Sequence, residues 1–235
     1  GIKLWVDGSS SSGESWSLEP SDVDDGHYGS HYFELENLIE AITHAETHQY
    51  DVKLHVNGDA AVRTALDAME DVQDTLGQLN QRYNFEHVVL VNPEDYDRMY
   101  NLGVVASIQP SHALVGIYGD QADHWQDGRI DRAWDFPSLE ENDIPIAIGT
   151  DWPVWPTPDG ITNWKTSTAG LQSRNLQHDT VMNGYGNIGR VSSGWGSLTF
   201  TDGDFADFIV VSSDPSESID SVEILETWVG GRRVY

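Results

Sequence analysis

Two hydrophobic periods alternate along residues 1–150 of the chain. Short apolar runs predict buried strands, and stretches with an apolar residue at every third or fourth position predict amphipathic helices. Strands are predicted at residues 2–7, 52–56, 84–90, 103–108 and 145–149. Helices are predicted over residues 34–48 and 59–76, from residue 92 onward and over residues 137–142. This repeated succession of strand and helix favours an α/β fold with a parallel sheet.

Three longer segments lack either period. Residues 8–32 and 109–133 are predicted to be long loops, and residues 152–195, with many Trp, Gly, Asn, Ser and Thr residues, are expected to be irregular. After them, short strands are predicted at 197–200, 206–212 and 222–235, with turns at Asp202-Gly203 and Gly230-Gly231. The sequence therefore predicts an α/β domain over residues 1–195 and a small β module over residues 196–235.

The composition narrows the kinds of function. The chain has no cysteine, which excludes disulfides, thiolate zinc sites and cysteine nucleophiles. Its formal net charge of −27, from 39 Asp and Glu residues against 12 Lys and Arg residues, opposes nucleic-acid binding. No apolar run reaches the roughly 18 residues of a membrane span, and no secretory signal pattern is visible near Gly1. We therefore expect a cytoplasmic protein that does not contact a membrane.

Four polar residues lie at or near the C-terminal ends of predicted strands, where an α/β barrel gathers its catalytic residues: Lys3, His55, His87 and Asp151. Imidazole nitrogens and carboxylate oxygens hold zinc and similar divalent ions. A lysine ammonium has no lone pair, but reaction with carbon dioxide turns it into a carbamate whose oxygens can bridge metals. Structural interpretations stay open: a solvated lysine at a strand end, hydrogen-bonded core histidines, and an aspartate that serves a turn.

Other motifs favour structural roles. His44 and His48 imitate the His-Glu-x-x-His zinc motif, but Glu46 stands one place late, so exposed helix positions are expected. Residues 184–189 match Gly-x-Gly-x-x-Gly, yet no predicted strand precedes them and no predicted helix follows, so a flexible loop is expected. Asp59 is predicted to cap the helix that follows it.

Six motifs follow one another along nearly the whole chain: Ile-Lys-Leu-Trp-Val-Asp-Gly, His-Val-Asn-Gly-Asp-Ala-Ala-Val, Phe-Glu-His, Ser-Ile-Gln-Pro-Ser-His, Gly-Thr-Asp-Trp-Pro-Val and the ending Ala-Asp-Phe-Ile-Val-Val…Thr-Trp-Val-Gly-Gly-Arg-Arg-Val-Tyr. Each motif alone is a weak signal. Together and in this order they resemble the amidohydrolase superfamily, most closely its YtcJ-like, amidohydrolase-3 branch of metal-dependent hydrolases.

The resemblance implies a (β/α)8 barrel with a β-sandwich built from both chain ends. Lys3, His55 and His87 would be the metal ligands on barrel strands 4, 5 and 6, with Lys3 open to carboxylation. Asp151, at strand 8, would bind the metal and take the proton from the attacking water. The implied cofactor is a divalent metal, zinc above all. Candidate substrate contacts are His112, in the strand-7 loop, Arg132 and Trp152, although Trp152 could equally cover an open side of the barrel.

Three departures from the family shape the expectation. The chain has no counterpart of the strand-1 His-x-His pair, and it starts at strand 4, so strands 1–3 are absent. The helix that follows strand 8 in the family is not recognisable in residues 152–195. Gly203-Asp204 stands where the family has Gly-Lys before the last strands. We therefore expect a partial TIM barrel, the C-terminal portion of an amidohydrolase, that holds one metal ion or none. Two functions stay open: hydrolysis of a C–N bond in an amide-type small molecule, or a catalytically inactive remnant with a binding role, a regulatory role or none.

The dispersed acidic residues and the scarcity of lysine (Lys3, Lys53 and Lys165) predict adaptation to very high salt, of the haloarchaeal type. Repulsion between surface carboxylates is screened beyond about 3 Å in 1 M salt but only beyond about 10 Å in 0.1 M salt. We therefore expect partial unfolding when salt is removed, measured as a loss of far-ultraviolet circular dichroism in a salt titration. Full secondary structure without salt would contradict this prediction.

A partial barrel would expose strand edges and its apolar interior. We therefore expect the chain to associate with itself or with a partner that supplies the missing strands. Sedimentation velocity in high salt should then show a species larger than one chain. A stable monomer across a concentration series would count against the expected association.

Overall fold

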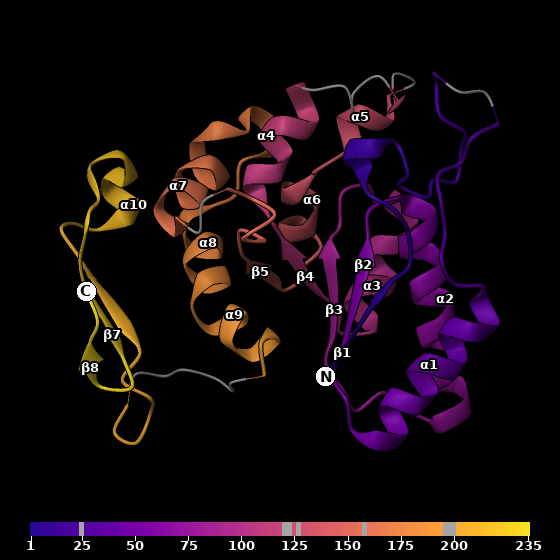
Figure 1. Ribbon diagram of the computed structural model, residues 1–235, viewed down its shortest axis with the longest axis horizontal. Helices are drawn as coiled ribbons and strands as arrows, with labels where there is room; N and C mark the ends of the chain where they lie inside the picture. Colours follow the sequence, from indigo (N-terminus) through magenta and orange to yellow (C-terminus); the bar gives the residue numbers. More distant parts are fainter. Residues whose placement is uncertain (24–25, 119–123, 126–127, 157–158, 195–200) are drawn as a thin grey trace.

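The computed structural model describes residues 1–23, 26–118, 124–125, 128–156, 159–194 and 201–235. Five parallel strands stand in the order β1-β2-β3-β4-β5, and three antiparallel strands, β6-β7-β8, form a second sheet near the C-terminus (Figure 1). Strands and helices alternate from β1 to β5. The predicted α/β class with a parallel sheet is confirmed.

Each strand of the parallel sheet pairs with its neighbours in the sequence. The strands are β1 (Ile2–Trp5), β2 (Val52–Val56), β3 (Tyr83–His87), β4 (Val105–Ile108) and β5 (Ile146–Ile148). Successive side chains of a strand point to opposite faces. In β2, Val52, Leu54 and Val56 are fully buried, whereas Lys53 and His55 are only partly buried. The sheet therefore has one apolar face that packs on helices and one face that carries polar side chains.

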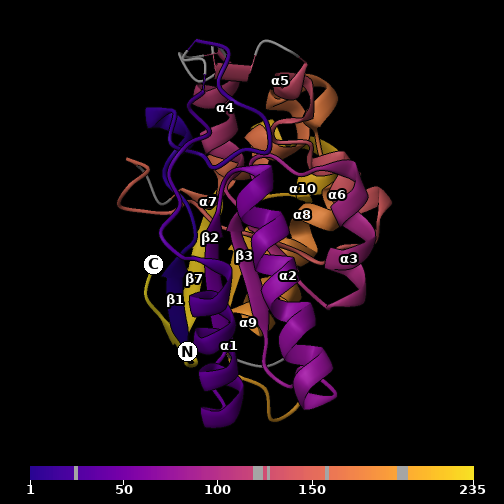
Figure 2. The same ribbon diagram turned by 90° about the vertical axis from the view of Figure 1, so that its right-hand side faces the viewer.

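Two long helices cover the apolar face of the sheet near β1 and β2. Helices α1 (Leu35–His48) and α2 (Asp59–Leu76) pack against each other, and α2 also contacts β2 (Figure 2). Val62, Leu66 and Met69, on the predicted apolar side of α2, are fully buried. Burial of one such side chain contributes about 1.5–3 kcal/mol. Shorter helices follow β3 and β4 along the chain: η2 (Pro93–Asp95) with α3 (Tyr96–Asn101), and α6 (Phe136–Glu141).

The prediction that Asp59 caps α2 was wrong. Gly58 occupies the cap position, and no side chain accepts a hydrogen bond there. Asp59 instead accepts a hydrogen bond from the backbone N–H of Leu18 at 2.8 Å and lies 4.0 Å from a guanidinium nitrogen of Arg132. The carboxylate therefore anchors a segment that is 41 residues away in the sequence, a contact that local sequence cannot reveal.

The segment of residues 109–133 is largely helical where it is described, so the prediction of a long loop was wrong. Helix α4 (Pro110–Tyr118) begins just after β4, and α5 (Arg129–Arg132) follows it. Pro110 stands at the first helical position, where the missing N–H would have had no partner in any case. A proline after a strand suggests a turn, but here it begins a helix.

Residues 159–194 are also mostly helical, which corrects the expectation of an irregular segment. They form α7 (Gly160–Lys165), the π-helical turn η4 (Thr166–Gly170), η5 (Gln172–Arg174), α8 (His178–Tyr185) and α9 (Asn187–Ser192). The Gly-x-Gly-x-x-Gly match therefore lies in two helices, not in a flexible loop. Gly184 packs so closely on β5 that a Cβ atom would lie 2.8 Å from Cγ1 of Ile148. At this position of α8 a glycine packs on the sheet, so the residue adds nothing to the apolar period that marks a helix.

The C-terminal sheet agrees with the β structure predicted at 206–212 and 222–235. Strands β6 (Phe208–Val211), β7 (Ile224–Val229) and β8 (Arg232–Arg233) pair antiparallel, and α10 (Pro215–Ser218) and η6 (Ile219–Ser221) connect the first two. Gly230 and Gly231, with φ of +55° and +74°, make the predicted two-residue turn. The strand predicted at 197–200 lies outside the described residues, and the division into domains at residue 195 stays a prediction.

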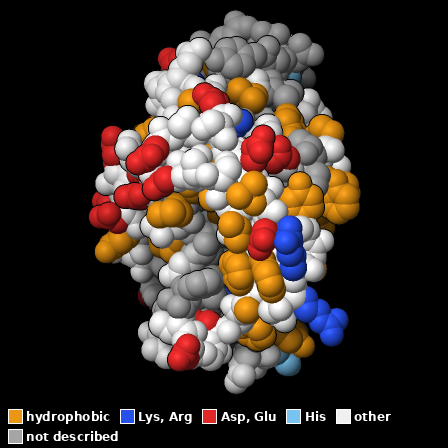
Figure 3. All heavy atoms as spheres, turned by 90° about the vertical axis from the view of Figure 1, so that its left-hand side faces the viewer, with side chains coloured by type: hydrophobic (Ala, Val, Ile, Leu, Met, Phe, Trp, Pro, Cys, Tyr) orange, Lys and Arg blue, Asp and Glu red, His pale blue; other side chains and the backbone are white. Residues whose placement is uncertain are grey.

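Several hydrophobic side chains of the C-terminal sheet remain more than a third exposed: Ile209, Val210, Leu225 and Val229. Figure 3 views this side of the molecule and shows hydrophobic side chains gathered beside acidic ones. In the described part of the chain, no helix combines the length and the apolar character that crossing a membrane requires.

Candidate metal centre

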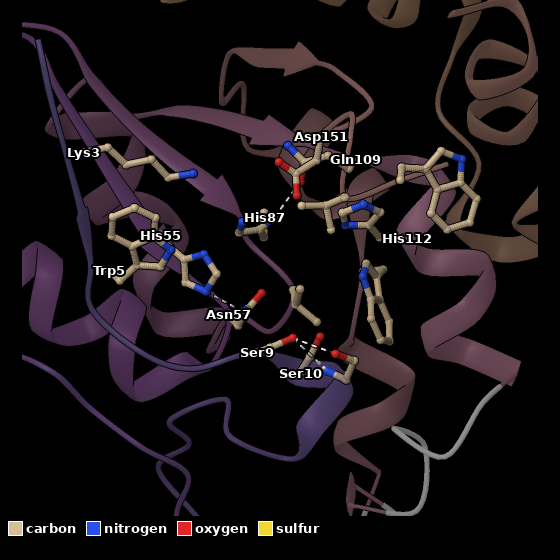
Figure 4. Close-up of a pocket in the computed structure, with 15 residues that line it drawn as sticks. Lys3, Trp5, Ser9, Ser10, His55, Asn57, His87, Gln109, His112 and Asp151 are labelled. Carbon is tan, nitrogen blue, oxygen red and sulfur yellow. Dashed lines mark hydrogen bonds between the residues drawn. The ribbon is translucent and has the colours of Figure 1, made fainter. Parts of the chain in front are cut away.

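The C-terminal ends of the parallel strands surround a cavity of about 450 Å³ (Figure 4). Lys3 of β1, His55 of β2, His87 of β3 and Asp151 after β5 all line it. The structure thus brings together the four residues that the sequence places at strand ends, while their roles as ligands stay predictions. The remaining wall includes polar and aromatic side chains, among them Asn57, Gln109, His112, Trp5, Trp134 and Trp155.

A left-handed backbone conformation redirects His87 at the end of β3. By strand alternation His87 would share the direction of Tyr83 and Phe85, which point into the buried core. The φ angles of His87 (+79°) and Val88 (+49°) break this alternation, and His87 lines the cavity instead. Such a conformation costs a non-glycine residue about 1–3 kcal/mol. The surrounding contacts must therefore hold the strand end in place.

Gln109 determines which nitrogen of His87 carries the proton. Nδ1 of His87 lies 2.8 Å from Oε1 of Gln109, whose amide nitrogen donates to the Ser107 carbonyl at 3.2 Å. Because the amide nitrogen is engaged there, the amide oxygen faces His87 and accepts the Nδ1 proton. Nε2 of His87 therefore keeps a lone pair for a ligand.

Asn57 orients His55 on the other side of the cavity. The side-chain nitrogen of Asn57 donates to the Gly8 carbonyl at 2.8 Å and also lies 2.8 Å from Nε2 of His55. An amide nitrogen offers only donors, so Nε2 of His55 is the acceptor. The rings of His55 and His87 meet edge to face, with their centroids 4.5 Å apart. These two histidines therefore form one wall of the site, but only His87 has an unengaged Nε2.

The Asp7 carboxylate joins three backbone segments beside the cavity. It is fully buried and accepts hydrogen bonds from the N–H groups of Trp16 at 3.0 Å, Asn57 at 2.9 Å and Gly58 at 2.8 Å. Burial raises the pKa of Asp7 to about 7, whereas the three N–H donors favour its ionised form. The carboxylate fixes the segment after β1 against the turn after β2, and with it the position of Asn57.

His112 and Asp151 complete the cavity on the side of β4 and β5. The ring centroid of His112, in the first turn of α4, lies 6.1 Å from that of His87, and its Nε2 atom is buried without a hydrogen-bond partner. Asp151 follows β5 with a φ of +57°. Ligand atoms of His87, His112 and Asp151 lie within 4.8 Å of one another, so this group could hold a metal ion. The sequence resemblance implied that His112 contacts the substrate. The motifs that carry the resemblance do not indicate that His112 lies close to His87 and Asp151.

Burial keeps the cavity histidines neutral at neutral pH. It lowers the pKa of His55 and of His87 to about 4, and it lowers the pKa of His112 in the same direction. The neighbouring His87 adds to the effect on His55, because two imidazolium charges would repel each other. A neutral imidazole presents the lone pair that a metal ligand needs.

Aromatic side chains form much of the remaining wall. Nζ of Lys3 lies 5.4 Å from the ring centroid of Trp5, within cation–π range, and the ring of Trp155 lies 5.6 Å from that of His112. Trp5, Trp134 and Gln109 are cavity residues that the sequence did not predict as site residues. Trp5 and Gln109 lie inside the motifs that carry the resemblance, which is the signal that could have found them.

Arg132 and Trp152 are not among the described residues that line the cavity. Arg132 donates from Nη1 to the Val91 carbonyl at 3.0 Å, and Trp152 is 61% exposed. Their role as substrate contacts stays a prediction. His44 and His48 are exposed on α1, as predicted, with ring centroids 4.0 Å apart.

Comparison with known proteins agrees with the sequence resemblance. A family model described as "Amidohydrolase family" matches residues 1–188. Among curated proteins, "Protein LONG AFTER FAR-RED 3" of Arabidopsis thaliana is 26% identical over 252 residues. That alignment covers 100% of this chain but 42% of the plant protein, so the chain spans less than half of the length of this relative.

Solved structures share the fold at low sequence identity. A metal-dependent hydrolase from Pyrococcus furiosus matches with a TM-score of 0.74 and 22% identity, over 84% of this chain and 41% of its own. The A. niger ochratoxinase matches with a TM-score of 0.70 and 18% identity, over 99% of this chain and 50% of its own. At these identities the similarity concerns the fold alone.

Replacement of Asp7 by asparagine should destabilise the protein. The amide keeps one acceptor oxygen but turns an NH2 group toward a backbone N–H, and a buried donor without an acceptor costs about 1–3 kcal/mol. We expect the free energy of unfolding to fall by about that amount in urea titrations at high salt. Asp74→Asn, at an exposed position of α2, is the matched control and should change it by less than about 0.5 kcal/mol. Equal unfolding midpoints for the two variants would contradict the role given to Asp7.

Proposed function

Because the chain belongs to the amidohydrolase family, we propose that it acts, alone or as part of a longer protein, as a metal-dependent hydrolase of C–N bonds in amide-type small molecules. The family and its hydrolase neighbours support metal-dependent hydrolysis in general. The observation that carries the proposal is the convergence of neutral imidazoles and the Asp151 carboxylate in one cavity at the strand ends.

The donors in the cavity fit a divalent cation of the zinc type. Catalytic zinc sites use about three imidazole and carboxylate ligands and leave one position open for water. The buried Nε2 of His112 lacks a hydrogen-bond partner, and Nε2 of His87 keeps its lone pair, so donors of the required chemistry are present. The predicted ligands are His55, His87 and Asp151, with Lys3 as a further one if it is carboxylated. A bound cation would lower the pKa of a water molecule toward 7 and polarise the amide carbonyl.

Asp151 is the proton acceptor in this proposal. Its carboxylate lines the same cavity as the histidines and is only partly buried, so a substrate and a water molecule can reach it. The water that attacks the amide carbon would lose its proton to this carboxylate, which can then pass the proton to the departing nitrogen. Trp5, Trp134 and Trp155 would hold the apolar part of the substrate and exclude other water.

A partial TIM barrel is the architecture that best suits this function. The five strands pair in parallel in consecutive order, and the cavity opens at their C-terminal ends, where TIM barrels carry their active sites. In this proposal the chain associates with itself or with a partner that carries strands 1–3.

An inactive amidohydrolase with a binding or regulatory role is the alternative. Two of the four predicted ligands are engaged elsewhere: Nε2 of His55 accepts a hydrogen bond from Asn57, and Lys3 lies over the Trp5 ring. Both arrangements would have to change before these side chains could hold a metal.

Zinc-loaded protein in high salt should hydrolyse at least one member of a panel of N-acyl amino acids, N-formyl amino acids and dipeptides, measured by release of free amine.

His87→Ala should weaken zinc binding by at least about tenfold, measured by elemental analysis after dialysis. Asp151→Asn should lower the rate by about 10²–10⁴-fold, because it removes the proton acceptor. His48→Ala, on the exposed face of α1, should change neither quantity.

Two outcomes would decide against parts of this proposal. Zinc-loaded protein that hydrolyses no member of the panel would favour the inactive alternative. A His87→Ala protein that keeps stoichiometric zinc would contradict the position given to the metal.

A further inference from the structure

We infer that His112 is itself a metal ligand, so that the cation of this chain lies between His87, His112 and Asp151. This inference rests on the proposed function only in requiring a divalent cation, and it does not depend on which bond is cleaved. It changes the role of His112 from a substrate contact to a ligand, and the role of His55 from a ligand to a positioning residue.

Proximity is the first argument. One ligand atom from each of His87, His112 and Asp151 lies within 4.8 Å of the other two. Imidazole and carboxylate ligands bind zinc at about 2.0–2.2 Å, which places ligand atoms about 3.4 Å apart around a tetrahedral ion, so the three side chains would move closer together to share one ion. Among the described residues, no other group of three His, Cys, Asp or Glu side chains meets this condition.

The unpaired nitrogen of His112 is the second argument. Its Nε2 atom is buried and has no hydrogen-bond partner, which is rare for a polar atom inside a protein. The ring of Trp155 lies beside His112, with the ring centroids 5.6 Å apart, and makes no hydrogen bond to this nitrogen. A cation shared with His87 and Asp151 would give this nitrogen the partner that the protein does not supply.

The supports behind His112 and Asp151 are the third argument, because ligating side chains need partners that hold them in position. Asn163 is buried on α7, and its side-chain oxygen accepts hydrogen bonds from the N–H and the hydroxyl of Ser111, at 3.0 Å and 2.6 Å. Its side-chain nitrogen donates to the Gly149 carbonyl at 2.8 Å. One amide therefore joins the residue before His112 to the segment that leads to Asp151.

Gln109 extends the same support to His87. Its side chain accepts the Nδ1 proton of His87, and its backbone carbonyl accepts a hydrogen bond from the N–H of His112 at 2.9 Å. The side chains of Asn163 and Gln109 thus connect the segments that carry the three proposed ligands.

His55 has the opposite arrangement. Its Nε2 atom accepts a hydrogen bond from Asn57, and Asp7 stands 3.9 Å from the same atom. These contacts belong to the Asp7 cluster at the ends of β1 and β2. They hold the His55 ring against that of His87, which makes His55 a wall that limits where the His87 ring can turn.

Cobalt(II) and zinc(II) are the probes for this inference, because two imidazoles and one carboxylate suit both ions and leave positions open. We would titrate the protein with cobalt(II) in high salt, follow its visible absorption, and obtain zinc affinity by competition. His112→Ala should weaken binding at least tenfold and change the cobalt spectrum, as should His87→Ala. His55→Ala removes only the wall beside His87 and should weaken binding less than either ligand variant. His48→Ala, on the exposed face of α1, is the control and should keep the affinity within about threefold and the spectrum of the unmodified protein.

His112→Gln, which preserves size and polarity, repeats the test in case the alanine variant folds poorly, and far-ultraviolet circular dichroism verifies the fold of each variant. Unchanged cobalt affinity and spectrum in folded His112→Gln and His112→Ala would overturn the inference. Loss of binding in His55→Ala but not in the His112 variants would overturn it too, and would support the ligand set implied by the family resemblance. The measured quantity here is metal binding and not hydrolysis. A protein that hydrolyses no amide would therefore count against the proposed function, but the metal-binding data would still test the role of His112.

Discussion

The site depends on a buried carboxylate that is paired with backbone N–H groups rather than with a cation. Asp7 receives the N–H groups of Trp16, Asn57 and Gly58, which come from two segments far apart in the sequence. The approach is so close that a Cβ atom at Gly58 would lie 1.9 Å from the carbonyl oxygen of Trp16. Only glycine fits there. The end of β1, the segment after it and the start of α2 are therefore fixed together, and the position of His55 follows from them through Asn57.

Backbone strain is the second constraint on the cavity. His87, Val88, Asp151 and Trp134 all have positive φ angles, between +49° and +79°, and each of them lies at or next to the cavity. Non-glycine residues adopt this conformation at a cost of about 1–3 kcal/mol each. The buried strands and α2 supply the stability that offsets this cost. The strain serves a purpose, because strand alternation alone would direct His87 into the core and not toward Asp151.

The sequence predicts the parallel sheet and the four strand-end residues because both depend on local patterns and on a fixed chain order. Apolar residues at alternate positions mark β2, and a periodic stripe marks α1 and α2, since these elements bury their own apolar side chains. The helices after β5 are harder to predict because one position that packs closely on β5 is Gly184, which adds nothing to an apolar period. The hydrogen bonds of Asn163 to Ser111 and Gly149 could not be predicted either. These partners are 52 and 14 residues away in the sequence, and nothing near Asn163 indicates them.

Two of the three cavity histidines are oriented by amide side chains, and this choice has an electrostatic consequence. Asn57 holds His55, Gln109 holds His87, and Asn163 holds the residue next to His112. A carboxylate in place of Asn57 or Gln109 would favour the charged imidazolium and raise the pKa of the histidine that it contacts. Amides fix the rings without that effect, so burial can keep the pKa of His55 and His87 near 4. In a chain whose formal net charge is −27, acidic groups are plentiful, and their exclusion from these supporting positions keeps the imidazole lone pairs open to a cation. Asp151 is then the anionic ligand that meets the ion directly, and the amides determine where it can do so.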